Sequence, residues 1–399
     1  MSNAINTLQR LLEPQERLDR LIASTFRRFG PRLVDLSYAN PCDGPSDEVQ
    51  SILARAAAEL RGRSLQYTPI AGRTAARRAV AAALEQRFGL PFEFRDVFLT
   101  AGAMPALNIV CRALFDAGDE VIVVTPAWQD YPLYLRNLQV DARLVPLQHD
   151  NHLDLDAIGA AIGPSTRGIL FSQPCCPTGV LYSRTEIERL ASILMEAEAR
   201  LGTRIYIVSD EVHRDLVWSG KSFHSPLQSY PRSISIYSFG KAFAMQGQRI
   251  GYLAICPRMP RLDEMRTTIE RCVRVMGFGH PTAIMQRAAG DLVDCRPAIA
   301  SLARAHALVR RSLKASGYDV CDGDASFYVY VKSPIDDDFA FAELLASHGV
   351  LVMPSTLFHD PGYVRLSLTA GRHAIETALP VLAAVLDETR EGIACSSRC

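Results

Sequence analysis

Short apolar runs alternate with amphipathic stretches through the middle of the chain. The runs are brief, rich in branched residues and closed by turn-forming residues, which is typical of buried strands. The predicted strands are residues 97–100, 121–124, 168–171, 205–209 and 234–237, with helical patterns such as 106–115 and 184–198 between them. This alternation predicts right-handed crossovers and an α/β fold whose mainly parallel sheet is covered by helices on both faces.

The two ends of the chain have different patterns. Residues 1–30 contain an amphipathic helix, 283–313 are helical, and 326–332, 350–353 and 363–368 indicate a second, smaller sheet. The polar tail after Asp387 is expected to fray. We therefore predict an N-terminal helical arm (1–30), a small α+β domain from both chain ends (31–50 and 285–399) and a large domain (51–284).

Composition narrows the class of protein. The 399 residues include 43 Lys plus Arg and 43 Asp plus Glu, so the basic excess that is typical of nucleic-acid binding is missing. No apolar run approaches the ~18 residues of a membrane span. Ten cysteines without a Cys-x-x-Cys pair favour reduced thiols and indicate neither a disulfide scaffold nor a metal site. We expect a cytoplasmic protein with no nucleic-acid or membrane partner and no metal.

Charged side chains follow two of the predicted strands. Asp210 comes directly after strand 205–209, and Lys241 comes shortly after strand 234–237. Ligands bind beyond the carboxyl ends of parallel strands, so both side chains are expected at the binding edge of the sheet. A carboxylate at the end of a buried strand needs a cation beside it, and Lys241 and Arg249 are the candidates.

The segments around Lys241 resemble a known family. Ser238-Phe239-Gly240-Lys241, followed by Gly247-Gln248-Arg249-Ile250-Gly251, is similar to the lysine motif of the class I/II aminotransferases, which are fold-type-I pyridoxal-phosphate enzymes. Further segments resemble the family's pattern in the same order, namely the tyrosine segment 67–72, the phosphate-binding turn 100–104, the aromatic loop 126–132, the Pro-Thr-Gly of 177–179 and the arginine segment 365–367. The resemblance implies a large domain with a seven-stranded sheet and a smaller α+β domain.

The resemblance also implies roles for the residues that match. Lys241 would hold pyridoxal 5'-phosphate as a Schiff base and then move the α proton of an amino-acid substrate, giving carbanion and quinonoid chemistry. Asp210 would pair with the pyridine nitrogen, and Trp128 would stack on the ring. Arg365 would grip the substrate carboxylate, in a pocket lined by Ala39.

The phosphate would be bound by several anion-binding groups. Gly102, Ala103 and Met104 follow a strand and open a helix, so their backbone N–H groups can point at an anion, and Ser238 and Arg249 would add hydrogen bonds. Tyr67 resembles the tyrosine that reaches the phosphate from the other subunit of a homodimer.

Several positions depart from the family's pattern. Cys176 stands where an asparagine would hydrogen-bond the cofactor's phenolic oxygen, and His213 stands where a tyrosine would do so. A thiol is a weaker donor than an amide, and His213 is expected to titrate near neutral pH. Gly240 replaces a serine, and Met104 takes a position that is often polar.

Three functions follow from these patterns. Amino transfer is the leading hypothesis. The Asp210–Leu216 string resembles that of cystathionine β-lyase-like enzymes, so β- or γ-elimination, or replacement in a lyase or bond-forming synthase of specialised biosynthesis, is the alternative. A third hypothesis is a sensory domain of a transcription factor, against which stand the zero net charge and the short segment ahead of the homologous region.

Overall fold

A seven-stranded sheet forms the centre of the computed structural model, which describes residues 3–396. The strand order is β2-β8-β7-β6-β5-β3-β4, and β8 is antiparallel to both of its neighbours while the other pairs are parallel. The strands are β2 (Val97–Thr100), β3 (Glu120–Thr125), β4 (Asp141–Pro146), β5 (Thr166–Ser172), β6 (Tyr206–Asp210), β7 (Ser233–Ser238) and β8 (Gly251–Ile255). The predicted α/β class and its mainly parallel sheet are confirmed.

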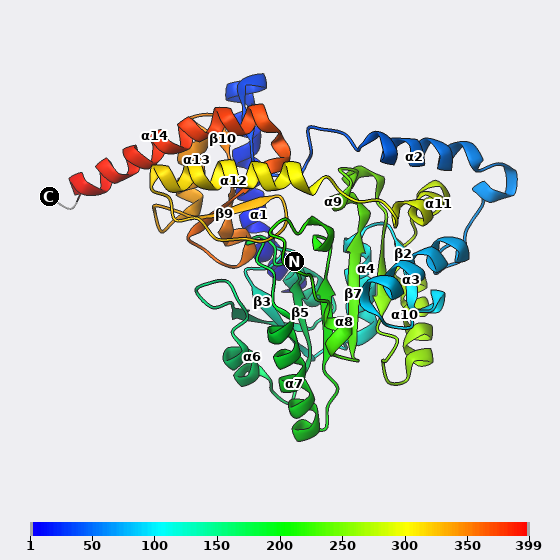
Figure 1. Ribbon diagram of the computed structural model, residues 1–399. Coiled ribbons are helices and arrows are strands. Elements are labelled where there is room, and N and C mark those ends of the chain that lie inside the picture. The colour runs from blue at the N-terminus through cyan, green and yellow to red at the C-terminus, as the bar shows by residue number, and fades with distance from the viewer. Residues whose placement is uncertain (1–2, 397–399) are drawn as a thin grey trace.

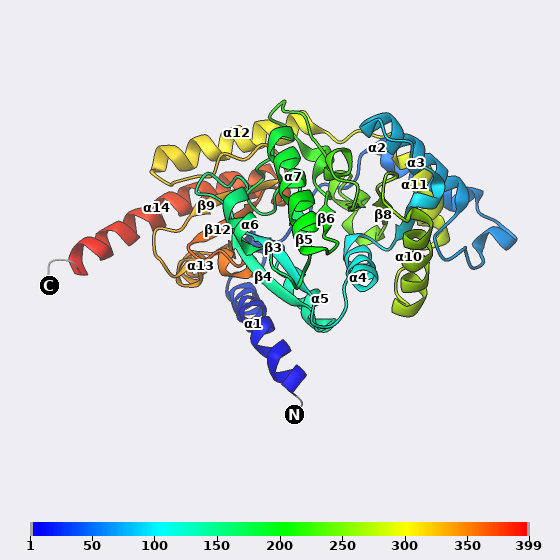
Figure 2. The same cartoon turned by 90° about the horizontal axis from the view of Figure 1, so that it is seen from below.

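The sheet is apolar on both faces because helices cover both. Along β3, Val121 and Val123 belong to one hydrophobic cluster, whereas Ile122 and Val124 belong to another. Successive side chains of a strand point to opposite faces, so each face has its own core. Figure 2 shows α7 (Arg184–Leu201) on one side of the sheet and α4 (Ala103–Leu114) and α5 (Tyr131–Asn137) on the other.

The remaining helices complete the two layers and the second body. They are α1 (Asn3–Phe29), α2 (Asp47–Glu59), α3 (Thr74–Phe88), α6 (Leu155–Ala161), α8 (Pro226–Ser229), α9 (Phe239–Ala242), α10 (Leu262–Met276), α11 (Ala283–Leu292), α12 (Ile299–Ser316), α13 (Asp338–Ser347) and α14 (Arg372–Ser396). Helix α7 shows how the sequence sets such bounds: Ser183 and Glu186 form a capping box at its start, and Gly202 ends it with φ +64°.

A smaller body is built from both ends of the chain (Figure 1). Its antiparallel sheet has the order β11 (Met353–Pro354), β12 (Tyr363–Ser367) and β9 (Tyr328–Lys332), and β1 (Val34–Asp35) pairs in parallel with β10 (Val350–Leu351). Helices α12, α13 and α14 pack on these strands around a separate core. The arm α1 is joined to this body because the buried Leu18 packs against Phe339, Met353 and Phe358.

Two predictions at the chain ends were wrong. The stretch expected to be helical over 283–313 is interrupted at residues 293–298: it forms two helices, α11 and α12, and Pro297 lies between them, where a proline cannot continue the helical hydrogen bonding. The tail expected to fray after Asp387 continues α14 to Ser396, and residues 397–399 of that tail lie outside the described part. Because α11 packs in the same cluster as α2 and α3, we propose the domain boundary near residue 296.

Candidate active site

Asp210 and Lys241 lie at the carboxyl ends of neighbouring parallel strands. Asp210 is the last residue of β6 and is in register with Ile236 of β7. Lys241 follows β7 on the short helix α9. Both side chains line the same cavity, and the positive charge of Lys241 favours the ionised form of Asp210. The fold therefore places these two groups together at one edge of the sheet, as the sequence predicts.

The Asp210 carboxylate is buried and held by two donors. The hydroxyl of Tyr131 donates to Oδ2 at 2.7 Å, and the backbone N–H of Val212 donates to Oδ1 at 3.2 Å. Burial raises the pKa of Asp210, while these hydrogen bonds and Lys241 oppose that rise. Such a carboxylate is oriented and poorly solvated, so a cationic group placed beside it would be bound strongly.

A set of anion-binding groups surrounds the start of α4. Ala103 and Met104 form its first turn and line the cavity together with Ser238 and Arg249. Gly102 lies behind Arg249: it has φ +92°, and a Cβ atom there would stand 2.6 Å from Nη2 of Arg249. The free N–H groups of a helix N-terminus and a guanidinium suit a phosphate group.

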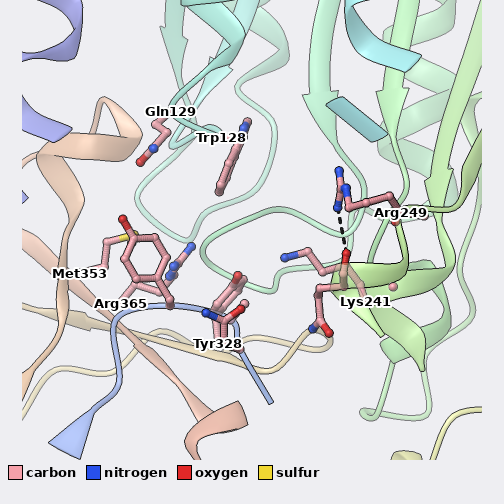
Figure 3. Close-up of a pocket in the computed structure, with 13 residues that line it drawn as sticks. Trp128, Gln129, Lys241, Arg249, Tyr328, Met353 and Arg365 are labelled. Atoms are coloured by element: carbon pink, nitrogen blue, oxygen red, sulfur yellow. Dashed lines mark hydrogen bonds between the residues drawn. The ribbon is translucent and has the colours of Figure 1, made fainter. Parts of the chain in front are cut away.

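Two adjoining cavities share Trp128, Ser238, Lys241, Arg249 and Tyr328 in their walls. Figure 3 shows Lys241 and Arg249 approaching the first cavity from one side and Arg365 and Met353 from the other. The predicted site residues that line one or both cavities are Ala39, Ala103, Met104, Trp128, Cys176, Asp210, His213, Ser238, Lys241, Arg249 and Arg365. Residues more than 300 positions apart in the sequence thus meet in one place.

Arg365 is a buried cation without a carboxylate partner among the residues the structure describes. It is 1% exposed, and its Nη2 donates to the carbonyl oxygen of Ser37 at 2.9 Å. Its Nε and Nη1 have no hydrogen-bond partner in the described chain. The guanidinium stacks 3.9 Å above the ring of Tyr328 and 4.7 Å from that of Phe358. Because burying an unpaired charge is unfavourable, two free N–H groups here are suited to an anionic ligand.

His213 and Cys176 are buried and neutral. Burial, together with the charges of Lys241 and Arg365, lowers the pKa of His213 well below its usual value, so the expected titration near neutral pH was wrong. Both ring nitrogens lack a partner in the described part of the chain, while Phe327 and Tyr328 pack edge-on at 5.3 and 5.7 Å. Burial also raises the pKa of Cys176 to about 11, so its thiol keeps its proton.

Tyr67 is the predicted site residue that lies apart from the others. Its side chain is fully exposed and lines a separate surface groove with Leu65 and His280. Within one chain it therefore takes no part in the cavity.

Several cavity residues were not predicted as site residues. Tyr131 stands in the aromatic loop, and its role could have been inferred from the need of Asp210 for a donor. Tyr38, Gln129 and Met353 also line the cavity, as does Tyr328. Their sequence signal is weak, because isolated aromatic, amide or methionine residues in loops and short strands are common.

Neither a metal-binding cluster nor a membrane-spanning helix is found in the described part of the chain. Within residues 3–396, no three His, Cys, Asp or Glu side chains gather as a metal-binding group. Over the same residues, no helix combines the length and apolar character that a bilayer crossing requires.

Comparison with known proteins agrees with this geometry. Residues 31–379 match the family described as aminotransferase class I and II. The aspartate/prephenate aminotransferase of Thermus thermophilus is 30% identical over 373 residues, which cover 91% of this chain and 94% of that protein. The structure of an amino transferase from Eubacterium rectale superposes with a TM-score of 0.89 at 25% identity, covering 93% of this chain and 95% of that one.

The aspartate aminotransferase structure from Thermotoga maritima superposes with a TM-score of 0.86 at 25% identity and covers 97% of this chain and 100% of that one. These relatives are aminotransferases, so the comparison favours amino transfer over elimination or replacement. Together with the lysine, carboxylate and arginine gathered at the sheet edge, the match over most of the sequence shows that the chain is an enzyme of the class I and II aminotransferase family.

Proposed function

We propose that this chain binds pyridoxal 5'-phosphate and transfers an amino group between an amino acid and a keto acid. The observation that carries the proposal is the placement of Asp210 and Lys241 at the ends of adjacent strands, facing one cavity. Unpartnered buried polar groups in the same walls support it, because Arg365 and the His213 ring need ligand atoms to complete their hydrogen bonds.

The residues present fit this cofactor. Lys241 would attach to its aldehyde carbon, Asp210 would pair with its ring nitrogen, and Trp128 would cover the ring face. Its phosphate would lie against Ser238, Arg249 and the first turn of α4, behind which Gly102 leaves room for the guanidinium. His213 and Cys176 would face the phenolic oxygen. When bound, the cofactor supplies the electron sink that takes up the electron pair of the broken Cα–H bond.

The protein's own groups do the remaining work. Arg365 orients the substrate by its α-carboxylate, since a planar guanidinium with two free N–H groups matches that anion. With its Nζ freed by exchange for the substrate amine, Lys241 would act as the base that takes the proton from the substrate Cα. Burial of Asp210 and Arg365 reduces the hydration of these two groups and so strengthens their electrostatic contacts.

The test is to load the purified protein with pyridoxal 5'-phosphate, reduce it with borohydride and locate the added mass. Label on the peptide containing Lys241, and conversion of the loaded cofactor to its amine form by an amino donor, are the expected results. Lys241→Ala should lose both, while Lys221→Ala, which removes an exposed lysine paired with Asp324, should keep both. Label at other lysines only, or release of ammonia in place of amine-form cofactor, would contradict the proposal.

We further propose a homodimer in which Tyr67 of the partner subunit reaches the phosphate. In support, the exposed Tyr67 and Leu65 border a surface groove that contains His280, and a backbone hydrogen bond from Ala101 to Gly279 brings the exposed Phe278 close to the start of α4. An exposed apolar region of this kind is typical of a protein interface. Sedimentation of the loaded enzyme should show a dimer, and a fully active monomer would contradict it.

A cytoplasmic location is also proposed, on the composition and on the eight cysteines that the structure describes as unpaired, of which Cys111, Cys175 and Cys256 are buried. Cell fractionation tests it.

A further inference from the structure

A chain of hydrogen bonds joins helix α1 to the cavity wall. Gln129 lines the cavity beside Trp128, and its Nε2 donates to Oε1 of Gln15 at 2.8 Å. Nε2 of Gln15 in turn donates to Oδ1 of Asp19 at 2.7 Å and to the hydroxyl of Tyr38 at 2.9 Å. Tyr38 is itself part of the cavity wall. The polar wall of the substrate cavity is therefore held from behind by the N-terminal helix.

The carboxylate of Asp19 determines which groups donate and which accept along this series of hydrogen bonds. A carboxylate accepts hydrogen bonds and does not donate, so Gln15 turns its NH₂ group toward Asp19 and its oxygen toward Gln129. Gln129 must then present its NH₂ group to Gln15, which leaves its Oε1 as an acceptor. That oxygen is buried and has no hydrogen-bond partner among the described residues. A buried acceptor without a donor is unfavourable, so a ligand that donates a hydrogen bond is favoured at this wall.

Within this chain, the charges around the cavity leave no cation free for a second carboxylate on the substrate. Among the described residues, the cations that line the first cavity are Lys241, Arg249 and Arg365, and no carboxylate lines it. Each cation is already assigned, to the cofactor aldehyde, the phosphate and the α-carboxylate respectively. Asp19 lies one hydrogen bond behind this polar wall, next to Tyr38 and Gln15. Its negative charge opposes an acidic substrate side chain.

We infer that the amino-acid substrate has a side chain that carries hydrogen-bond donors and no negative charge, with Gln129 as the specificity-determining residue and Gln15 as a positioning residue behind it. This inference rests on the proposed function, because it takes the three cations as occupied. The inference predicts that aspartate and glutamate are not the preferred amino-group donors.

The experiment compares amino acids that differ only at the wall-facing group. The loaded enzyme is mixed with L-asparagine or L-aspartate, and with L-glutamine or L-glutamate, and single-turnover conversion of the cofactor is followed by absorbance. The amide of each pair is expected to exceed its acid in kcat/KM by about tenfold or more. Binding of succinamate and succinate, read from the same absorbance, extends the comparison to ligands that cannot react, and succinamate is expected to bind more tightly.

Variants assign the preference to residues. Gln129→Leu should reduce the amide-to-acid ratio, and Gln129→Arg should reverse it. Gln15→Leu should raise KM for the amide by about tenfold with kcat little changed, because it frees the Gln129 amide without touching the reacting atoms. Gln50→Leu, at an exposed glutamine whose Nε2 bonds only the Pro45 carbonyl oxygen, is the matched control and should change neither constant.

The outcomes separate this inference from the function on which it rests. Equal or faster reaction with the acids, or tighter binding of succinate, would overturn the inference and indicate a cation supplied by a second copy of the chain. An unchanged ratio in Gln129→Leu would overturn the role of Gln129. Failure of borohydride to label Lys241 would instead overturn the proposed function.

Discussion

The guanidinium of Arg249 lies against the backbone of Gly102, and a Cβ atom at position 102 would stand only 2.6 Å from its Nη2. Gly102 has φ +92°, a left-handed conformation that other residues adopt only under strain. The glycine therefore does two things at once: it turns the chain from β2 into α4, and it lets a cation approach the N-terminus of that helix.

Gly102→Ala should weaken uptake of pyridoxal phosphate by about tenfold or more, because the new methyl group displaces Arg249 from the helix N-terminus. The matched control is Gly118→Ala, where φ is +89° and the added Cβ meets nothing within 4 Å. Both variants should lose roughly 1 kcal/mol of unfolding free energy from backbone strain. Titration of each apoenzyme with the cofactor, followed by absorbance, measures the difference; equal affinities would contradict the prediction.

Asp210→Asn should slow amino transfer by about 100-fold or more, since the amide cannot balance a cationic ring nitrogen. The pH dependence of stability gives a second readout. Burial raises the pKa of Asp210 in the folded chain, so the cofactor-free protein loses stability as pH rises from the unfolded pKa through the raised folded value.

At neutral pH the cofactor-free Asp210→Asn protein should thus melt above the cofactor-free wild type, and the order should reverse when both are loaded. The Tyr131 hydroxyl can turn to accept from the new amide, so the local packing is kept. Melting temperatures of the two proteins, with and without cofactor, provide the check. A cofactor-free variant that melts below the wild type at pH 7 would count against the buried-charge argument.

Arg365→Lys should raise KM for the amino acid by about 100-fold while cofactor uptake stays as in the wild type. An ammonium group lacks the planar pair of N–H groups and the stacking over Tyr328. Arg372→Lys serves as control, because Arg372 lies on the surface of α14, where its guanidinium pairs with Glu376. Steady-state kinetics on both variants decide the matter, and an unchanged KM in Arg365→Lys would show that the carboxylate binds elsewhere.

His306 should make the protein sensitive to acid. Burial lowers the pKa of His306 to about 4, while its Nε2 lies 2.9 Å from the carbonyl oxygen of Ser326 and its ring stacks on Trp218. The unfolded chain binds this proton near pH 6.5, so stability falls as pH drops from that value to about 4.

His306→Gln should remove about 3 kcal/mol of that acid loss, because glutamine has no proton to gain over this range. Urea unfolding at pH 7, 5.5 and 4 measures the slope. The exposed His373→Gln variant should follow the wild type. If His306→Gln loses stability with acid as steeply as the wild type, the buried imidazole is not the cause.

The sequence predicted the parallel core well because each of its strands is short, apolar and buried by covering helices. It missed β4, an edge strand with mostly exposed or half-buried residues, whose apolar signal is weak. It also missed β8, which is fully buried but begins at Gly251, the last residue of the lysine motif, with no turn residue to separate the two.

Site residues on the binding edge could be predicted from strand ends and from family motifs, and all of them except Tyr67 and Gly102 line the cavities. The rest of the site depends on long-range packing. Gln129 meets Gln15 across 114 positions of sequence, and the neutral state of His213 follows from burial beside Lys241 and Arg365. The local sequence pattern contains neither of these facts. The protonation state of His213 and the role of Gln129 in substrate preference can therefore be inferred only from the folded structure.

The pairing of β1 with β10 also bears on how the protein is made. Val34 bonds across to the strand containing Val350, so the first strand has no partner until the ribosome has added more than 300 further residues. At roughly 5–20 residues per second that interval lasts from about a quarter of a minute to about a minute. During translation the amino-terminal segment therefore stays unpaired while the central sheet is already forming. Arg365 on β12 is synthesised later still, so it is among the last residues of the pocket to emerge.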